Sequence, residues 1–122
     1  MQKLLLGMFI LAGTFFSTTL FAEEIVWMKD INSAVKLAQK EQKTVMVLAE
    51  GKHCRWCVKM KHRTMADENV QKKLKSYIMV KVMREDEDAV KDLPIINGVP
   101  SIFFITPQED VIGTVTGSFN DE

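Results

Sequence analysis

The only two cysteines of this 122-residue chain lie three positions apart, in Cys54-Arg55-Trp56-Cys57. Two thiols at this spacing can bond to each other or exchange disulfides with another protein. A continuous apolar run and a short loop precede them, which places Cys54 at the start of a helix. Backbone N–H groups and the positive end of the helix dipole favour a thiolate there. We therefore expect the pKa of the Cys54 thiol to lie below its usual range.

Position also assigns different roles to the two thiols. Cys54 is the expected nucleophile, with Lys52, His53 and Arg55 adding positive charge that stabilises its thiolate. Cys57 lies one turn later on the same helical face and is shielded by the helix. It is therefore the expected resolving thiol, which attacks Cys54 once a mixed disulfide has formed.

Paired cysteines can also form a structural bridge, a zinc site or a haem attachment site, and this sequence fits each of these less well. An inert structural bridge would constrain the unfolded chain relatively little, because the loop that it closes is so short. A closed zinc site would need ligands beyond His53 and His62, and the chain has no second C-x-x-C. Covalent haem attachment requires histidine where Val58 stands. The sequence thus predicts no metal ligands and no cofactor besides the redox-active disulfide itself.

Helical and extended patterns alternate before and around the cysteines. Apolar residues recur at helical spacing over residues 31–38, with Asp30 as the expected N-cap. Residues 44–49 form a β-branched apolar run that suits a buried strand, which Gly51 ends. The next helical pattern covers residues 54–63 and resumes at residue 67, with Val58, Met65, Val70 and Leu74 directed inward.

The pattern of the second half of the chain predicts mainly strands. Residues 77–83 predict a strand, followed by the acidic run 85–88 and a short helix or turn. Residues 102–105 and 111–115 flank the turn-forming residues 107–110, which predicts a hairpin. Strand, helix, strand and an antiparallel pair indicate an α/β class with a mixed central sheet flanked by helices.

Several segments resemble the exported, periplasmic thioredoxin-like family over about residues 25–117. They are KTVMVLAEGKHCRWC at 43–57 with the following Val-Lys-Met, the pair Asn69-Val70, and the strand from residue 77. Gly98-Val99-Pro100 before an apolar strand resembles the cis-proline loop of that family. The sequence is most similar to small single-domain members and to the C-terminal domain of the thiol:disulfide interchange protein. The resemblance implies a thioredoxin fold.

The resemblance also implies roles in substrate binding. A cis peptide before Pro100 would turn the Val99 backbone outward beside the disulfide, where it can pair with an extended substrate segment. The pair between the cysteines departs from the family pattern, because Arg55-Trp56 stands where cytoplasmic thioredoxins have Gly-Pro. Trp56 is expected to form part of an apolar docking surface, and Arg55 to favour the thiolate. The alternative for Pro100 is an ordinary proline at the start of an edge strand.

This sequence departs from the family pattern at two further places. Thioredoxins carry an aspartate six residues before the first cysteine, where Leu48 stands here. Glu50 follows on the same strand face and is a candidate proton acceptor for the resolving thiol, the alternative being a solvated loop glutamate. The chain ends at residues 119–122, where the C-terminal helix of the family would begin. Either this helix is missing or the sequence is truncated.

The N-terminus has the pattern of an export signal. Lys3 precedes a largely apolar stretch at residues 4–21, and Ala22 supplies a small residue before the first acidic pair. We expect residues 1–22 to be a cleaved signal peptide and residues 23–122 to be the thioredoxin-like domain. The protein would then be periplasmic or otherwise exported, where disulfides persist. An uncleaved membrane anchor is the alternative.

Charge is balanced overall but uneven along the chain. Sixteen Lys and Arg residues against sixteen Asp and Glu residues argue against nucleic acid as a partner. Residues 52–75 hold eight basic and two acidic residues, whereas residues 84–92 hold two basic and five acidic ones. A basic surface near the cysteines could recruit an acidic partner or anionic lipid, and a solvated helix face is the plain alternative.

Three functions follow from these observations. The first is a reductase of disulfides in exported partner proteins, supplied with electrons by a membrane thiol reductase. The second is a disulfide oxidant or isomerase that acts on partner thiols. The third is a non-enzymatic copper or metal carrier that uses both cysteines and His53, suggested by eight methionines, although core packing accounts for most of these.

Overall fold

The computed structural model describes Gly13 and residues 25–117. Apart from Gly13, the predicted signal peptide at residues 1–22 lies outside the described residues, as do residues 118–122, where the C-terminal helix of the family would begin. In the described part of the chain, no helix has both the length and the apolar character needed to cross a membrane.

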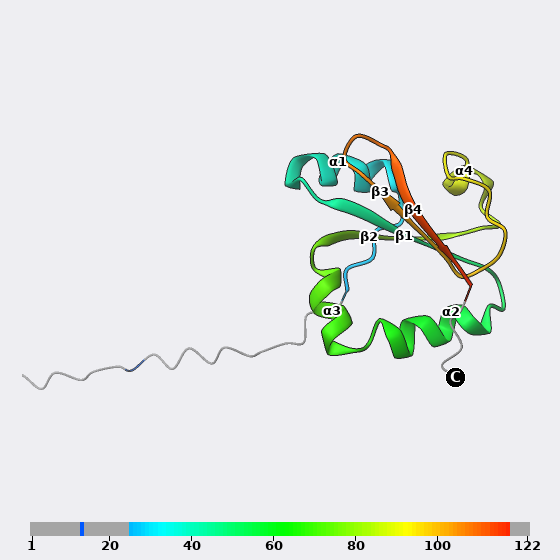
Figure 1. The fold of residues 1–122 in the computed structure, drawn as a ribbon, viewed down its shortest axis with the longest axis horizontal. Helices are drawn as coiled ribbons and strands as arrows, with labels where there is room; N and C mark the ends of the chain where they lie inside the picture. Colours follow the sequence, from blue (N-terminus) through cyan, green and yellow to red (C-terminus); the bar gives the residue numbers. More distant parts are fainter. Residues whose placement is uncertain (1–12, 14–24, 118–122) are drawn as a thin grey trace, which may run out of the picture.

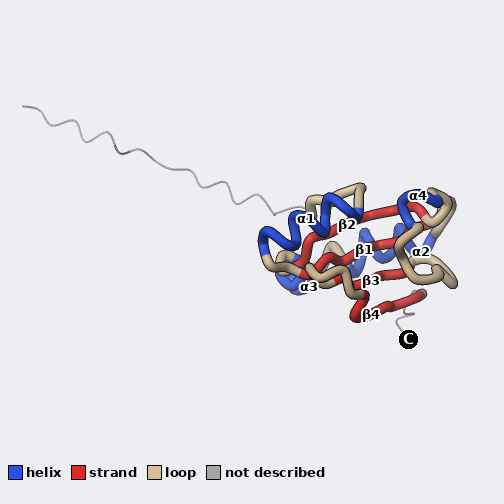
Figure 2. Tube along the Cα trace, turned by 90° about the horizontal axis from the view of Figure 1, so that it is seen from above, coloured by secondary structure: helices blue, strands red, loops and turns tan. Residues whose placement is uncertain are grey.

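Within residues 25–117, four strands form one mixed sheet in the order β2-β1-β3-β4 (Figure 2). Their bounds are Thr44–Glu50 for β1, Tyr77–Met83 for β2, Ser101–Ile105 for β3 and Val111–Thr116 for β4. β1 is parallel to β2 and antiparallel to β3, and β4 forms a hairpin with β3. The predicted mixed sheet is therefore confirmed, with β1 as a central strand.

Helices cover both faces of this sheet (Figure 1). α1 (Ile31–Glu41) and the short α4 (Glu87–Val90) lie on one face. On the other face, α2 (Arg55–Lys59) continues into a π-helical turn, η1 (Met60–Thr64), before α3 (Glu68–Leu74). The structure thus forms the thioredoxin fold expected from the sequence, with helix, sheet and helix as its three layers.

Aspartate side chains begin three of the helices. The Asp30 carboxylate accepts hydrogen bonds from the backbone N–H groups of Asn32 and Ser33 at the start of α1. Asp67 and Asp86 do the same for α3 and α4. Each satisfies N–H groups that have no partner within the helix. The N-cap that the sequence predicts at Asp30 is confirmed.

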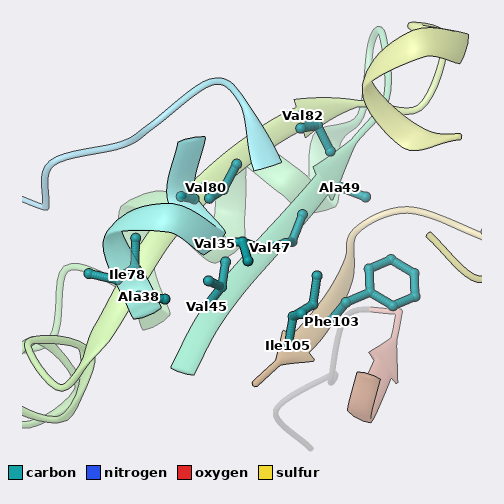
Figure 3. Packing of buried hydrophobic residues seen from close by; sticks show 11 residues of the cluster. Val35, Ala38, Val45, Val47, Ala49, Ile78, Val80, Val82, Phe103 and Ile105 are labelled. Atoms are coloured by element: carbon teal, nitrogen blue, oxygen red, sulfur yellow. The ribbon is translucent and has the colours of Figure 1, made fainter. Parts of the chain in front are cut away.

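The face under α1 is packed by apolar side chains from α1 and from strands β1, β2 and β3 (Figure 3). Val47 of β1 lies opposite Val80 of β2 and Phe103 of β3, and all three are completely buried. The remaining buried members of this cluster are Ala34, Val35, Ala38, Val45, Ala49, Ile78, Val82 and Ile105. Burial of this apolar surface is the main stabilising contribution on this side of the sheet.

The opposite face carries a second cluster, made from the alternate residues of the same strands. Its buried members are Met46, Leu48, Met65, Leu74, Met79 and Ile102. The inward direction expected for Met65 and Leu74 is confirmed, and Val70 is half-buried against this cluster. The direction expected for Val58 is wrong, because its side chain is 50% exposed. Cys57 is the α2 residue that is buried, so Val58, one position later, points away from the sheet.

Candidate active site

Cys54 and Cys57 form a disulfide, and their Cα atoms are 5.3 Å apart. β1 ends at Glu50, a loop follows, and Cys54 is the N-cap residue of α2. The expected position of Cys54 at a helix start is confirmed. Its sulfur accepts a hydrogen bond from the backbone N–H of Cys57 at 3.1 Å. In the reduced protein, the same N–H would favour the thiolate over the thiol.

The two sulfur-bearing residues differ in their exposure. Cys54 is half-buried, whereas Cys57 is only 3% exposed and packs beneath the helix. An external disulfide can therefore reach Cys54 but not Cys57. This difference supports the division into an attacking and a resolving thiol that the sequence predicts.

A hydrogen bond to an acidic side chain fixes the loop before Cys54. The backbone N–H of Lys52 donates a hydrogen bond to the Glu85 carboxylate at 2.9 Å. This bond lowers the pKa of Glu85, and the charges of Arg84 and Lys52 lower it further. His53 then adopts a left-handed backbone conformation, with φ of 56°, immediately before Cys54. The Lys52 and His53 side chains are exposed.

A second loop packs against the first one. The Val99–Pro100 peptide bond is cis, and Pro100 is fully buried. A Cβ atom placed on Gly51 would lie 2.9 Å from Cγ2 of Val99, so only a glycine lets the two loops approach this closely. Ser101 fixes the second loop by donating a hydrogen bond from its hydroxyl to the Gly98 carbonyl at 2.6 Å.

The Val99 backbone is free for a partner. The Pro100 carbonyl accepts a hydrogen bond from Gly117, but the Val99 N–H and C=O form no hydrogen bond with any described residue. The next residue, Ser101, begins β3. Val99 therefore presents an unpaired donor and acceptor next to the loop that leads to Cys54, as strand addition by an extended segment requires.

Glu50 is buried rather than solvated in a loop. It is the last residue of β1 and is 6% exposed, on the same sheet face as Leu48 and the active-site helix. Its Oε1 lies 2.6 Å from Nζ of Lys61 in η1. Lys61 follows Cys57 by four residues, so the two side chains share one helical face. The carboxylate, the ammonium group and the resolving cysteine thus lie in the same layer, between α2–η1 and the sheet.

Exposed apolar and basic side chains follow Cys54 in α2. Trp56 is 41% exposed, and Nζ of Lys59 lies 4.4 Å from the centre of its ring. Arg55 is also exposed. Trp56 is therefore available for docking, as the sequence predicts, and cations lie beside it.

Three of the methionines pack in the core of the part of the chain that the structure describes. No group of three or more His, Cys, Asp or Glu side chains there could hold a metal ion. Met46, Met65 and Met79 are buried in the apolar cluster instead. Their packing role agrees with the interpretation that core packing accounts for most of the methionines.

Sequence reasoning missed three residues that shape the site: Gly51 as the contact between the loops, Ser101 as the anchor of the second loop, and Lys61 as the partner of Glu50. Helical spacing from Cys57 would have identified Lys61 as an inward-facing residue. The other two depend on contacts between segments far apart in the chain, for which the sequence carries no local signal.

Solved structures similar to this one share its fold. A thioredoxin from Thermus thermophilus superposes with a TM-score of 0.63 at 22% identity, covering 79% of this chain and 78% of the thioredoxin. The oxidised C-terminal domain of DsbD from Neisseria meningitidis gives a TM-score of 0.60 at 17% identity, covering 77% of this chain and 89% of that domain.

Sequence comparisons agree with the structural ones. A family model described as thioredoxin-like matches residues 26–107. A curated mouse protein, anterior gradient protein 3, is 27% identical over 103 residues, which is 83% of this chain. The chain spans 61% of the length of that relative.

Proposed function

The chain belongs to the thioredoxin-like family, and on this premise we propose that it is a dithiol–disulfide oxidoreductase that acts as an exported reductase of disulfides in partner proteins. The observation that carries the proposal is the pairing of a half-buried Cys54 with a buried Cys57 at the start of α2. The Cys54 sulfur is accessible to a protein substrate, whereas the buried Cys57 sulfur can attack Cys54 after a mixed disulfide has formed.

The proposed reaction moves two electrons to the substrate. The Cys54 thiolate attacks a substrate disulfide, forming a mixed disulfide and releasing one substrate thiolate. Cys57 then loses its proton and attacks Cys54, which releases the second substrate thiolate and leaves the Cys54–Cys57 disulfide. A dithiol on an external protein must return two electrons to start another cycle, and we propose a membrane thiol reductase as that donor. The reaction needs no cofactor besides the disulfide itself.

Glu50 is the proposed acceptor of the Cys57 proton. Its carboxylate is buried on the helix side of the sheet, and in the described structure its one close polar contact is the Lys61 ammonium. A buried base that is not surrounded by water can take a proton from the resolving thiol within the same layer. Lys61 is the proposed positioning residue, because its ion pair holds the carboxylate beneath the active-site helix.

Substrate binding is assigned to three residues beside the cysteines. Val99, held by the buried cis Pro100, offers its unpaired N–H and C=O groups to an extended substrate backbone. Trp56 offers an exposed aromatic surface. Arg55, His53 and Lys52 are proposed to stabilise the Cys54 thiolate by their positive charge.

The basic surroundings of Cys54 favour a second candidate function. A strongly stabilised thiolate makes the reduced protein more stable and the disulfide more oxidising. The same site would then act as an oxidant or isomerase of exported proteins. The candidates differ in net electron transfer: a reductase gives two electrons to the substrate, an oxidant takes two from it, and an isomerase transfers none.

Export itself is proposed from the pattern of residues 1–22, with its short basic start, apolar stretch and small exit residue. The partners are then thiol-containing or disulfide-containing proteins of the same compartment. Nucleic acid is not among the proposed partners.

Trapping the mixed disulfide tests the proposed function. The Cys57→Ser variant of the full-length protein should accumulate covalent partner adducts in cells, seen on non-reducing gels and removed by dithiothreitol. The Cys54→Ser, Cys57→Ser double variant is the matched control and should form none. A Cys57→Ser protein without adducts at wild-type abundance would contradict the proposal.

A further inference from the structure

Three basic side chains follow one another along the outer face of α2 and η1, and we call Arg55, Lys59 and Arg63 the basic row. Between residues 51 and 66 the chain has five Lys or Arg residues and no Asp or Glu. Lys61 is paired with Glu50, and Lys52 lies near Glu85. The members of the basic row are exposed or half-buried and form no ion pair with any described carboxylate.

Helix stability explains the basic row only in part: Lys59 and Arg63 lie in the last turns of α2 and η1, where the helix dipole favours cations. The members of the basic row are spaced four residues apart, where like charges repel each other and destabilise a helix. α3 differs in having acidic residues as well as lysines. Lys72 and Lys73 lie in the last turn of that helix, and Asp67 and Glu68 lie at its start, an arrangement that the helix dipole favours. No acidic residue between residues 51 and 66 offsets the repulsion along the basic row in this way.

Apolar side chains lie among these cations, next to the reactive cysteine. Trp56 and Val58 are 41% and 50% exposed, and Lys59 stacks over the Trp56 ring. An apolar centre with a basic border matches a protein segment that has apolar and acidic side chains. An anionic bilayer is the poorer match, because a membrane bound to this face would cover Cys54.

The other side of the site has the opposite charge. The loop that contains Glu85 and the short α4 carries four consecutive acidic residues, 85–88. Figure 1 shows α2 and α4 at the same end of the sheet, on opposite faces. A bound segment therefore meets positive charge on the α2 side of Cys54 and negative charge on the α4 side.

We propose that the preferred substrates carry Asp or Glu residues beside the disulfide that Cys54 attacks, and that the basic row binds them. This inference rests on the proposed thiol–disulfide exchange and adds the chemical class of its substrates. Lys59 and Arg63 act on encounter and orientation of the substrate, so they select between substrates without taking part in the bond exchange, whereas Arg55 also stabilises the Cys54 thiolate.

Peptides that differ only in charge test the inference. Two disulfide peptides of equal length, one with Glu and one with Lys beside the cysteines, are reduced by the reduced protein, and the initial rates are compared. We expect the Glu peptide to react about tenfold faster at an ionic strength of about 0.01 M, and the ratio to approach one at about 1 M. Equal rates at low salt would overturn the inference.

Matched charge reversals locate the effect. The Lys59→Glu, Arg63→Glu double variant should lose the tenfold preference or invert it. The control is Lys36→Glu, Lys40→Glu, which makes the same charge change on α1, on the opposite face of the sheet. The control should keep the preference, and an equal loss in both variants would show that only net charge matters and would overturn the assignment to the basic row.

Two further readouts separate this inference from the proposed function. Reduction of hydroxyethyl disulfide, which is small and neutral, reports exchange without charge recognition. Turnover of this probe with no peptide preference would overturn the inference alone, whereas no turnover at all would contradict the proposed function. Sedimentation of the protein with anionic phosphatidylglycerol vesicles, lost in the Lys59→Glu, Arg63→Glu variant, would assign the basic row to a membrane and overturn the inference.

Discussion

The two faces of the sheet are built from alternate residues of the same strands, yet they serve different purposes. The face under α1 is apolar throughout, with Val47, Val80 and Phe103 completely buried. The face under α2 and α3 contains a similar apolar cluster, but it also holds the disulfide-bonded Cys57 and the buried Glu50. Charge is thus buried on the face that carries the cysteines.

This difference indicates that stability and chemistry are assigned to opposite sides of one strand. In β1, Val47 and Ala49 point to α1, whereas Leu48 and Glu50 point to the active-site helix. Burial of an apolar face carries no electrostatic cost. The other face contains the Glu50–Lys61 ion pair, whose removal from water costs free energy. We assign this ion pair a role in the reaction.

Phe103→Ala should give the largest effect and should be confined to stability. Removing a completely buried aromatic side chain leaves a cavity, and we expect the free energy of unfolding to fall by about 3–5 kcal/mol. The rate of exchange per folded molecule should stay unchanged. Urea unfolding and hydroxyethyl disulfide reduction measure the two quantities. If Phe103→Ala prevents folding, Val47→Ala offers a smaller cavity on the same face.

Glu50→Leu combined with Lys61→Met tests the face under α2 and α3. This double variant should separate the stability of the fold from the rate of the resolving step. Apolar replacement of a buried ion pair is often neutral or stabilising, by up to about 4 kcal/mol, so unfolding should not become easier. The resolving step should slow by about 100-fold, because Cys57 loses its proposed proton acceptor. Wild-type resolution rates in rapid-mixing experiments would refute the role of Glu50. Lys61→Met alone should be less stable than the double variant, since it leaves a buried carboxylate unpaired.

Gly51→Ala should disturb the contact between the two loops, with a smaller effect. The added Cβ would lie 2.9 Å from Cγ2 of Val99, and relief of this clash should cost about 1–3 kcal/mol of stability. Movement of Val99 should also weaken peptide binding by a few-fold, as measured by KM for a disulfide peptide. Gly113→Ala in β4 is the control, because its Cβ would meet Phe104 at 3.4 Å. Equal KM values for both variants and the wild type would contradict a role for Val99 in binding.

Acid should break the hydrogen bond between Glu85 and the loop before Cys54. This is the smallest of the expected effects. The Lys52 N–H holds the pKa of Glu85 below its usual 4.5. The hydrogen bond therefore contributes fully above pH 4.5 and is lost as the pH falls through the lower value of the folded protein. The NMR shift of the Lys52 amide should titrate with a midpoint below 4.5 and should stop titrating in Glu85→Gln. A midpoint at or above 4.5 would contradict this contact in solution.

Much of the fold could be predicted from local patterns. The apolar runs indicated β1 and the β3–β4 hairpin, and Asp30 indicated the start of α1, because each signal lies within a few neighbouring residues. The direction of Val58 was mispredicted because helical spacing alone does not say which of several apolar residues faces the sheet. The π-helical turn after α2 carries no sequence signal that we recognise.

The site could be predicted only in part, for a similar reason. Cys54 and Cys57 were evident from their spacing, and the cis peptide at Pro100 from a family resemblance. Strand periodicity gave the face of Glu50 but not its burial, which depends on an ammonium group from a different element. Contacts of this kind are set by packing between distant segments rather than by local pattern.

The reduction potential of the Cys54–Cys57 pair tests the central claim most directly. The domain is equilibrated against glutathione redox buffers, and the thiol state is read by a gel shift after alkylation. A reductase requires a potential close to that of thioredoxin, about −270 mV, and this is the value that we predict. A potential near about −120 mV would contradict the proposed direction and would make the protein an oxidant of partner thiols.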